Sequence, residues 1–297
     1  MGCSTERTIE KIPEKNKGYP VCRLTVQLTD EIDCLVSYDS NRLLLGGKEE
    51  FQMFDLTTKN ISTISKEHKG RINCLIKLEN NKVVSGSQDK TIKIWDIEKK
   101  ECLYTLEGHT SIIWEIKSLT KNRLISAADD NTSRIWNLDK KSSEYFYKSK
   151  RHISSIAVLD NNRVLLTSGK NILLFDINTK EQLSFLDISV WVLKTLKNGD
   201  VAAGGRGFLY ILQITDEIKI KTKFGKGHNS TLTNIIELEN ENLVTSADEK
   251  NIILWDRNDP ESVYLIEGHK ENVMALCYIE GNKFASVSID KELKIWE

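Results

Sequence analysis

Histidine and cysteine are the residues of this chain with the most obvious capacity for chemistry. The 297 residues include five histidines and six cysteines. Histidine is the side chain most often used in acid–base catalysis, so each of the five is a candidate general base. The cysteines form no C-x-x-C pair, and the sequence contains no metal-ligand spacing, nucleophile elbow or phosphate-cradling glycine loop. The sequence therefore predicts no catalytic residue, no metal site and no cofactor.

Four of the five histidines occupy one position of a recurring segment, which indicates a structural role. The fullest copy, residues 67–96, carries His68, Ser85, Asp89 and Trp95. The last of these positions recurs at spacings of 41, 41, 39, 37, 43 and 41 residues. The residues at that position are Phe54, Trp95, Trp136, Phe175, Leu212, Trp255 and Trp296. Self-similarity at this period, with a histidine early and Trp-Asp late, is typical of propeller blades of four strands each.

Strands are the elements expected to position these residues. Each copy alternates apolar and polar residues over short runs, which is the period of a half-buried strand. In the second copy we expect strands at residues 72–78, 82–87, 91–97 and 101–106. Asn, Asp and Gly dominate the intervening turns because they tolerate positive φ. A single four-stranded sheet cannot bury both of its faces, so the blades are expected to stack radially.

The two ends of the repeat region predict how the ring closes. The sequence stops at Trp296-Glu297, where the third strand of the last copy ends. Residues 21–28 precede the first strand of the first copy and have no other place in the register. We expect them to form the fourth strand of the last blade. The predicted fold is all-β: a single seven-bladed β-propeller of four-stranded antiparallel blades over residues 19–297, after a flexible tail of residues 1–18.

These segments resemble the WD-repeat family of β-propellers, from about Tyr19 to Glu297. The resemblance implies that a loop histidine donates to a turn aspartate, while a serine and the tryptophan complete a buried hydrogen-bonded chain. Carried over by position, the expected networks are His68, Ser85, Asp89 and Trp95; His109, Ser126, Asp130 and Trp136; and His269, Ser286, Asp290 and Trp296. In the sixth copy His228 and Trp255 are joined by Ser246 or Thr245, and Glu249 stands where Asp is expected.

The first, fourth and fifth copies lack this network. Their Asp positions carry Lys48, Gly169 and Arg206, and their His positions carry Leu28, Ser149 and Leu186. The fifth histidine, His152, lies three residues out of register and is expected at the surface of a loop. The run of residues 204–207, Gly-Gly-Arg-Gly, falls at the turn of a degenerate blade with no following helix, so a turn is expected there rather than a phosphate site.

Two tryptophans are much larger than the residues at the equivalent position of the other copies. Trp114 and Trp191 share one position of the first strand, where the other copies carry Asp33, Asn73, Ser154, Thr233 and Met274. Strands of this kind line the central channel of a propeller, and their first residues lie near one rim. Interface hot spots favour Trp and Arg. Trp114, Trp191 and Arg206 are therefore candidate partner-binding residues, and packing between blades is the alternative for the two tryptophans.

The first residues of the chain form a second functional motif. Met1-Gly2-Cys3-Ser4-Thr5 resembles the start of doubly acylated signalling proteins, with myristate on Gly2 and palmitate on Cys3. The usual motif has Ser or Thr at position 6, where this chain has Glu6. The hypothesis is a tail that attaches the propeller peripherally to the cytoplasmic face of a membrane.

Composition narrows the class of function. The 42 basic and 43 acidic residues give a net charge of -1, which argues against a dedicated nucleic-acid binder. Cysteines at repeat positions indicate small buried residues of a reduced cytosolic protein. We therefore expect a non-enzymatic scaffold, a monomeric propeller within a complex, that binds other proteins or peptides and no small-molecule substrate. A ubiquitin-ligase substrate receptor and a subunit of an RNA- or chromatin-associated complex are the alternatives.

Overall fold

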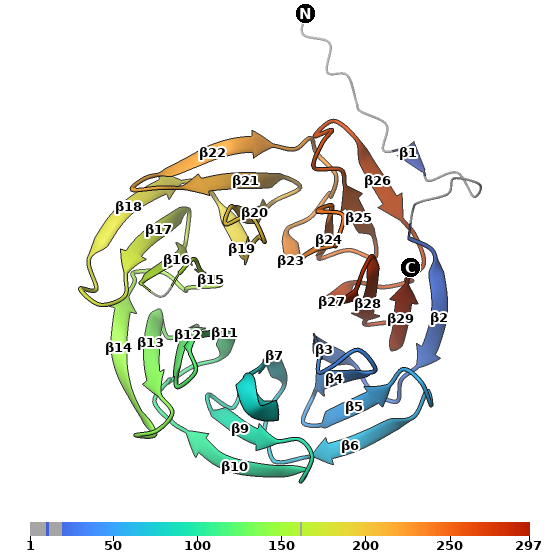
Figure 1. Cartoon of the computed structure of the whole chain (residues 1–297), viewed down its shortest axis with the longest axis horizontal. Coiled ribbons are helices and arrows are strands. Elements are labelled where there is room, and N and C mark those ends of the chain that lie inside the picture. Colours follow the sequence, from blue (N-terminus) through green and yellow to red (C-terminus); the bar gives the residue numbers. More distant parts are fainter. Residues whose placement is uncertain (1–9, 12–19, 161) are drawn as a thin grey trace, which may run out of the picture.

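The computed structural model describes residues 10–11, 20–160 and 162–297. Seven sheets are arranged in a ring around a central axis, and the chain passes from blade to blade in sequence order (Figure 1). Neighbouring strands within each blade are antiparallel. The predicted seven-bladed, all-β propeller is confirmed.

Within each blade the four strands run from the axis to the outside. The innermost strands are β3 (Ile32–Ser37), β7 (Ile72–Lys77), β11 (Ile113–Thr120), β15 (Ile156–Val158), β19 (Val190–Thr195), β23 (Leu232–Glu237) and β27 (Val273–Glu280). The second strands are β4 (Arg42–Gly47), β8 (Lys82–Ser87), β12 (Arg123–Ala128), β16 (Arg163–Ser168), β20 (Val201–Gly205), β24 (Leu243–Ala247) and β28 (Lys283–Ser288).

The outer half of each blade is built in the same way. The third strands are β5 (Phe51–Asp55), β9 (Ile92–Asp96), β13 (Thr132–Asn137), β17 (Asn171–Asp176), β21 (Leu209–Ile214), β25 (Ile252–Trp255) and β29 (Glu292–Trp296). The outermost strands are β6 (Ile61–Ser65), β10 (Glu101–Leu106), β14 (Ser142–Lys148), β18 (Gln182–Asp187), β22 (Ile218–Lys223), β26 (Val263–Ile266) and β2 (Cys22–Gln27). The strands of the second blade lie within one residue of the predicted ranges, and the turn at Glu79–Asn81 is a short 3-10 helix, η1.

The seventh blade is completed by the first long strand of the chain. β2 pairs antiparallel with β29, with Cys22 opposite Trp296 and Gln27 opposite Glu292. Val21 and Glu297 exchange both backbone hydrogen bonds, at 2.9 and 3.0 Å. Leu28, which follows β2, is buried in the cluster shared by the first and seventh blades. Residues 21–28 thus close the ring by hydrogen bonds and burial, as expected.

One strand lies outside the repeat pattern. β1 (Glu10–Lys11) pairs in parallel with β26, so that the sheet of the sixth blade has five strands. These two residues belong to the predicted flexible tail of residues 1–18, and no strand is expected there because they lie outside the repeat. Residues 1–9 and 12–19 lie outside the described part of the chain.

The hydrophobic core lies between blades rather than inside any one of them. Trp95 packs with Leu44 and Phe51 of the preceding blade, and Trp136 packs with Ile94 in the same manner. The tryptophans that close the second, third, sixth and seventh blades are all nearly inaccessible to solvent. Each blade therefore depends on its neighbours for burial, which makes the ring the unit of stability.

Candidate functional site

The expected histidine networks are assembled in four blades. In the third blade, His109 Nδ1 lies 2.8 Å from Asp130 Oδ2 and His109 Nε2 lies 2.6 Å from Ser126 Oγ. Trp136 Nε1 donates to the same Ser126 oxygen at 2.8 Å. The second and seventh blades repeat this geometry within 0.1 Å, with His68, Ser85, Asp89 and Trp95 and with His269, Ser286, Asp290 and Trp296.

In the sixth blade, the sequence left open whether Ser246 or Thr245 joins the network, and the structure shows that it is Thr245. His228 Nε2 lies 2.7 Å from Thr245 Oγ1, and Trp255 Nε1 donates to that oxygen at 2.7 Å. Ser246, the next residue of the same strand, accepts from Asn234 instead. Successive side chains of a strand point to opposite faces, so only one of the two can reach the histidine. Glu249 replaces the usual aspartate, at 2.6 Å from His228 Nδ1.

The donors and acceptors of each network match when histidine is neutral and the carboxylate is ionised. The indole N–H donates to the serine oxygen, the serine hydroxyl donates to Nε2, and Nδ1–H donates to the carboxylate. Burial lowers the pKa of His109. Burial opposes ionisation of Asp130, but hydrogen bonds from Thr132, the Thr110 backbone and His109 outweigh it and lower its pKa. Both ring nitrogens are thus engaged, and neither is left to act as a base.

Two other groups with reactive side chains are likewise engaged or inert. His269, Asp290 and Glu292 could together offer ligand atoms to a metal ion. However, the two ring nitrogens of His269 already contact Asp290 and Ser286, so this group is the network of the seventh blade. Burial raises the pKa of the Cys277 thiol to about 12, which leaves it protonated and unreactive near neutral pH.

In the three blades that lack the network, other residues occupy the positions of the histidine and the aspartate. Leu28 is buried, and Leu186 packs against the apolar cluster between the fourth and fifth blades. In the fourth blade Ser149 replaces the histidine and shares a short hydrogen bond with Ser168. Lys48 and Arg206 stand exposed at their turns, and Gly169 adopts a left-handed conformation with φ of +62°.

The two unusual tryptophans lie at a repeated irregularity of the innermost strands. In β11, Ile113 is opposite Ala128 and Glu115 is opposite Ala127, so Trp114 has no partner across the strand. The same β-bulge occurs in six blades, including β19, where Trp191 is the unpaired residue. A bulge can re-aim a side chain away from the sheet. Trp114 and Trp191 are 41% and 44% exposed, which favours a partner-binding role over packing between blades.

Trp114 and Trp191 lie at equivalent positions of the third and fifth blades, so they flank the fourth blade on the same rim. His152, in the loop that enters the fourth blade, packs its ring against Trp191 with the centroids 5.0 Å apart. Ser154 occupies the same rim position as the tryptophans, between them in the ring. Arg206, at the turn of the fifth blade, is exposed and forms an isolated bridge with Thr231. We call Trp114, His152, Ser154, Trp191 and Arg206 the rim arc.

Hydrogen bonds between blades hold the rim arc in place. Ser155 Oγ donates to Glu115 at 2.7 Å and accepts from the Leu193 backbone at 2.9 Å, which links the third, fourth and fifth blades. On another part of the rim, Arg71 pairs with Glu31 and Asp33 at 2.6 Å each. The charges there are already satisfied within the molecule, whereas the rim arc presents aromatic surface on a rigid support.

The fold and its histidine networks define a β-propeller of the WD-repeat class. The family model for the WD domain, G-beta repeat, matches residues 59–96, 100–137 and 260–297. These three segments are therefore WD repeats. The matched copies include three of the four blades that carry a tryptophan at the closing position.

Curated relatives share short stretches of this chain. WD repeat-containing protein pop2 of Schizosaccharomyces pombe is 28% identical over 34% of the chain and 14% of its own length. F-box/WD repeat-containing protein sel-10 of Caenorhabditis elegans is 36% identical over 18% of the chain and 9% of its own length. Elongator complex protein 2 of S. pombe is 29% identical over 28% of the chain and 12% of its own length. The chain thus spans far less than two thirds of the length of these relatives.

Proposed function

We propose that this protein is a non-enzymatic scaffold that binds a partner protein at the rim arc. The observation that carries the proposal is the exposure of Trp114 and Trp191 on bulges that interblade hydrogen bonds hold in place. Large exposed aromatic residues on a rigid support are the usual anchors of protein interfaces. The four network histidines support the absence of catalysis, because their ring nitrogens are occupied within the fold.

Replacing both rim tryptophans should abolish partner binding without unfolding the propeller. A hot-spot tryptophan contributes about 2 kcal/mol or more to an interface, so Trp114→Ala with Trp191→Ala should reduce recovery of the partner by at least about tenfold. The measurement is quantitative affinity capture of the full chain from a eukaryotic lysate, with mass spectrometry of the recovered proteins and thermal unfolding of each variant.

The matched control removes apolar surface of similar exposure elsewhere. Tyr145 and Ile220 lie on the outer strands β14 and β22 and are also exposed. Tyr145→Ala with Ile220→Ala should recover the same proteins as the wild type. Equal recovery by the rim variant and the control variant would contradict the assignment of the rim arc.

Membership of a larger assembly is the second candidate function. One relative is named as an F-box/WD repeat-containing protein and another as a subunit of the Elongator complex. We propose that this chain likewise works within a complex, as a substrate receptor or as a structural subunit. Reciprocal capture with the recovered partner as bait would separate a stable stoichiometric subunit from a transient substrate.

We further propose that acylation of Gly2 and Cys3 attaches the propeller to the cytoplasmic face of a membrane. Both residues lie outside the described part of the chain, and the motif alone carries the proposal. β2 begins opposite the end of β29, whereas the rim lies at the start of the innermost strands. β2 therefore begins on the face opposite the rim arc, and attachment on that face would leave the rim accessible. Among the residues with described positions, no helix is long and apolar enough to span a bilayer.

If both residues are acylated, the wild type should sediment with membranes and Gly2→Ala should become soluble. Cys3→Ser should associate weakly and reversibly, since a single myristoyl chain binds with an association constant of only roughly 10⁴ M⁻¹. The measurement is fractionation of eukaryotic cells that express chains with a native N-terminus, with intact-mass analysis of the first peptide. An unmodified Gly2 in that peptide would refute the proposal.

A further inference from the structure

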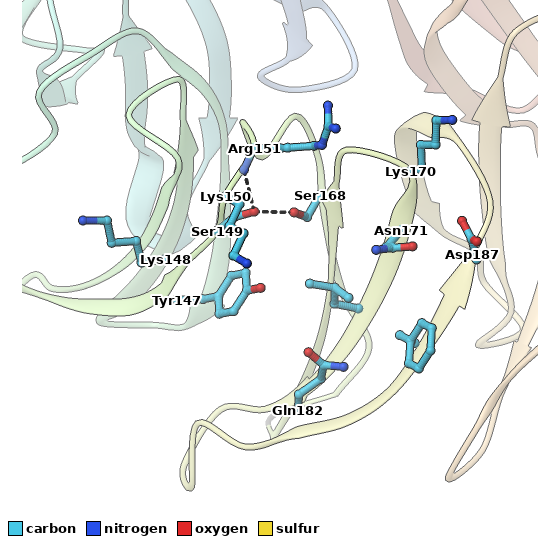
Figure 2. Close-up of a pocket in the computed structure, with 12 residues that line it drawn as sticks. Tyr147, Lys148, Ser149, Lys150, Arg151, Ser168, Lys170, Asn171, Gln182 and Asp187 are labelled. Carbon is cyan, nitrogen blue, oxygen red and sulfur yellow. Dashed lines mark hydrogen bonds between the residues drawn. The ribbon is translucent and has the colours of Figure 1, made fainter.

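A recessed surface lies on the outer side of the fourth blade, where Arg151 is next in sequence to His152 of the rim arc. It is a groove of about 700 Å³ between the end of β14 in the third blade and strands β16, β17 and β18 of the fourth. Tyr147, Ser149 and Arg151 line it from the end of β14 and the loop that follows, and Lys170 and Gln182 line it from the fourth blade (Figure 2). Phe185 of β18 also lines the groove. We call it the blade-4 groove. Its volume is within the range of ligand-binding clefts.

The charge of the groove follows from the degenerate repeat. Four other blades place a histidine and a carboxylate at this level, whereas the fourth blade has Ser149 and Gly169. The Ser149 and Ser168 hydroxyls bond to each other, and the Arg151 backbone donates to Ser149 at 3.0 Å. Gly169 therefore supplies no carboxylate, and the next residue, Lys170, is a cation. A lysine also follows the carboxylate in three of those blades, as Lys90, Lys250 and Lys291, so the turn of the fourth blade differs by keeping the cation without the carboxylate.

The cations of the groove have no internal partner. Lys150, Arg151 and Lys170 are exposed, and within the described part of the chain none has a carboxylate within ion-pairing distance. By contrast, Arg257 is paired with Glu237 at 3.0 Å. Lys148 also lines the groove, but its amine points away from the seryl pair, and Asp187 is the one carboxylate among the lining residues (Figure 2). The groove therefore holds a local excess of positive charge.

An apolar platform adjoins these cations. Phe185 is 61% exposed on β18, and Leu183, two residues earlier, is 46% exposed. β18 is the last strand of its sheet, so one edge of its backbone is unpaired within the described chain. A free strand edge beside an apolar side chain can receive an extended peptide, which gains main-chain hydrogen bonds there.

We propose that the blade-4 groove binds a short acidic peptide segment of a partner protein. Carboxylates of the segment would pair with Arg151, Lys170 and Lys150, and an apolar side chain would pack on Phe185. A nucleic acid or an anionic membrane is a poorer match, because each needs a broad basic surface rather than three cations beside Asp187, and the chain as a whole has a net charge of -1. The site adjoins the rim arc at Arg151 and His152, but it is built on the outer strands of the blade rather than at the start of the innermost strands.

The probe is a fluorescein-labelled nonapeptide of alternating glutamate and leucine, titrated with the full chain at low and at physiological salt. Fluorescence anisotropy should show that the peptide binds the chain saturably and more weakly as the salt concentration rises. An analogue in which glutamine replaces every glutamate should not bind. Arg151→Glu with Lys170→Glu should weaken binding by at least about tenfold. Leucine stands at the position equivalent to Ser149 in the first and fifth blades, as Leu28 and Leu186. Ser149→Leu should therefore leave the chain folded, fill the groove and weaken peptide binding.

The matched control makes the same change of net charge on the opposite face of the propeller. Lys100→Glu with Lys140→Glu changes exposed turn residues of the second and third blades and should leave peptide affinity unchanged. Equal losses in the two double variants, or no saturable binding by the glutamate peptide, would overturn the proposal. Tighter binding by phosphatidylserine vesicles or by an oligouridylate than by the peptide, with the same dependence on Arg151 and Lys170, would also overturn it. Thermal unfolding of every variant verifies the fold.

Discussion

A chain that lacks residues 1–28 should fail to form a stable propeller, whereas a chain that lacks residues 1–17 should keep the fold. The longer deletion removes β2, the partner of β29, together with Leu28, which is 4% exposed. It leaves β29 as an unpaired edge, where aggregation is expected. Proteins are stable by only about 5–15 kcal/mol, so the loss of a whole strand should exceed that margin. Circular dichroism during thermal unfolding is the measurement.

The shorter deletion is the control, because it removes β1 but keeps every residue of β2. The pairing of Glu10 and Lys11 with β26 involves two residues, so its loss should change the melting temperature little. Leu28→Asp in the full chain should give an intermediate destabilisation, since the strand remains but a buried position is charged. The ring-closure argument fails if the two truncated chains melt at the same temperature.

His109→Ala should lower the free energy of unfolding of the propeller by about 1–3 kcal/mol, which is the usual cost of leaving a buried hydrogen-bonding group without its partner. The His109 side chain is fully buried, and its removal deprives both Asp130 and Ser126 of a hydrogen bond. His152→Ala should cost much less, because that ring is only partly buried and contacts the exposed Trp191. Urea unfolding of the two variants gives the comparison.

A double-mutant cycle distinguishes loss of the network from loss of packing volume. If His109 acts through Asp130, then His109→Ala with Asp130→Ala should destabilise the chain by less than the sum of the two single variants. Strictly additive losses would show that the ring contributes only by filling space. A larger loss at His152 than at His109 would mean that the register of the fourth blade is wrong.

The fold could be predicted because the information is repeated along the chain. Seven copies of one segment set the blade count, and the residues left over before the first copy indicated the closing strand. The networks followed by position. The choice between Thr245 and Ser246 was left open, although Thr245 lies 17 residues after His228, which is the spacing of histidine and serine in the other three networks. The strand β1 lies outside the repeat, so no periodicity indicated it.

The surfaces were harder to predict than the core, because exposure depends on residues that are distant in sequence. Trp114 stands out by its size, but whether it packs or projects is decided by the bulge in β11. The blade-4 groove combines residues of the third and fourth blades, and the only sequence signal was the loss of His and Asp at Ser149 and Gly169. That loss was interpreted as degeneration, although the same positions form a basic recess.

The bulge at the second residue of the innermost strands has an evolutionary consequence. In six blades the ladder of main-chain hydrogen bonds passes over this residue, so its side chain has no partner across the strand. The chain itself illustrates the resulting tolerance, since the seven equivalent positions hold two tryptophans, an aspartate, an asparagine, a serine, a threonine and a methionine. If the rim arc binds partners as proposed, mutations there would change its recognition specificity while the architecture is inherited intact. Partner choice in such a protein can therefore diverge between lineages faster than the propeller that presents it.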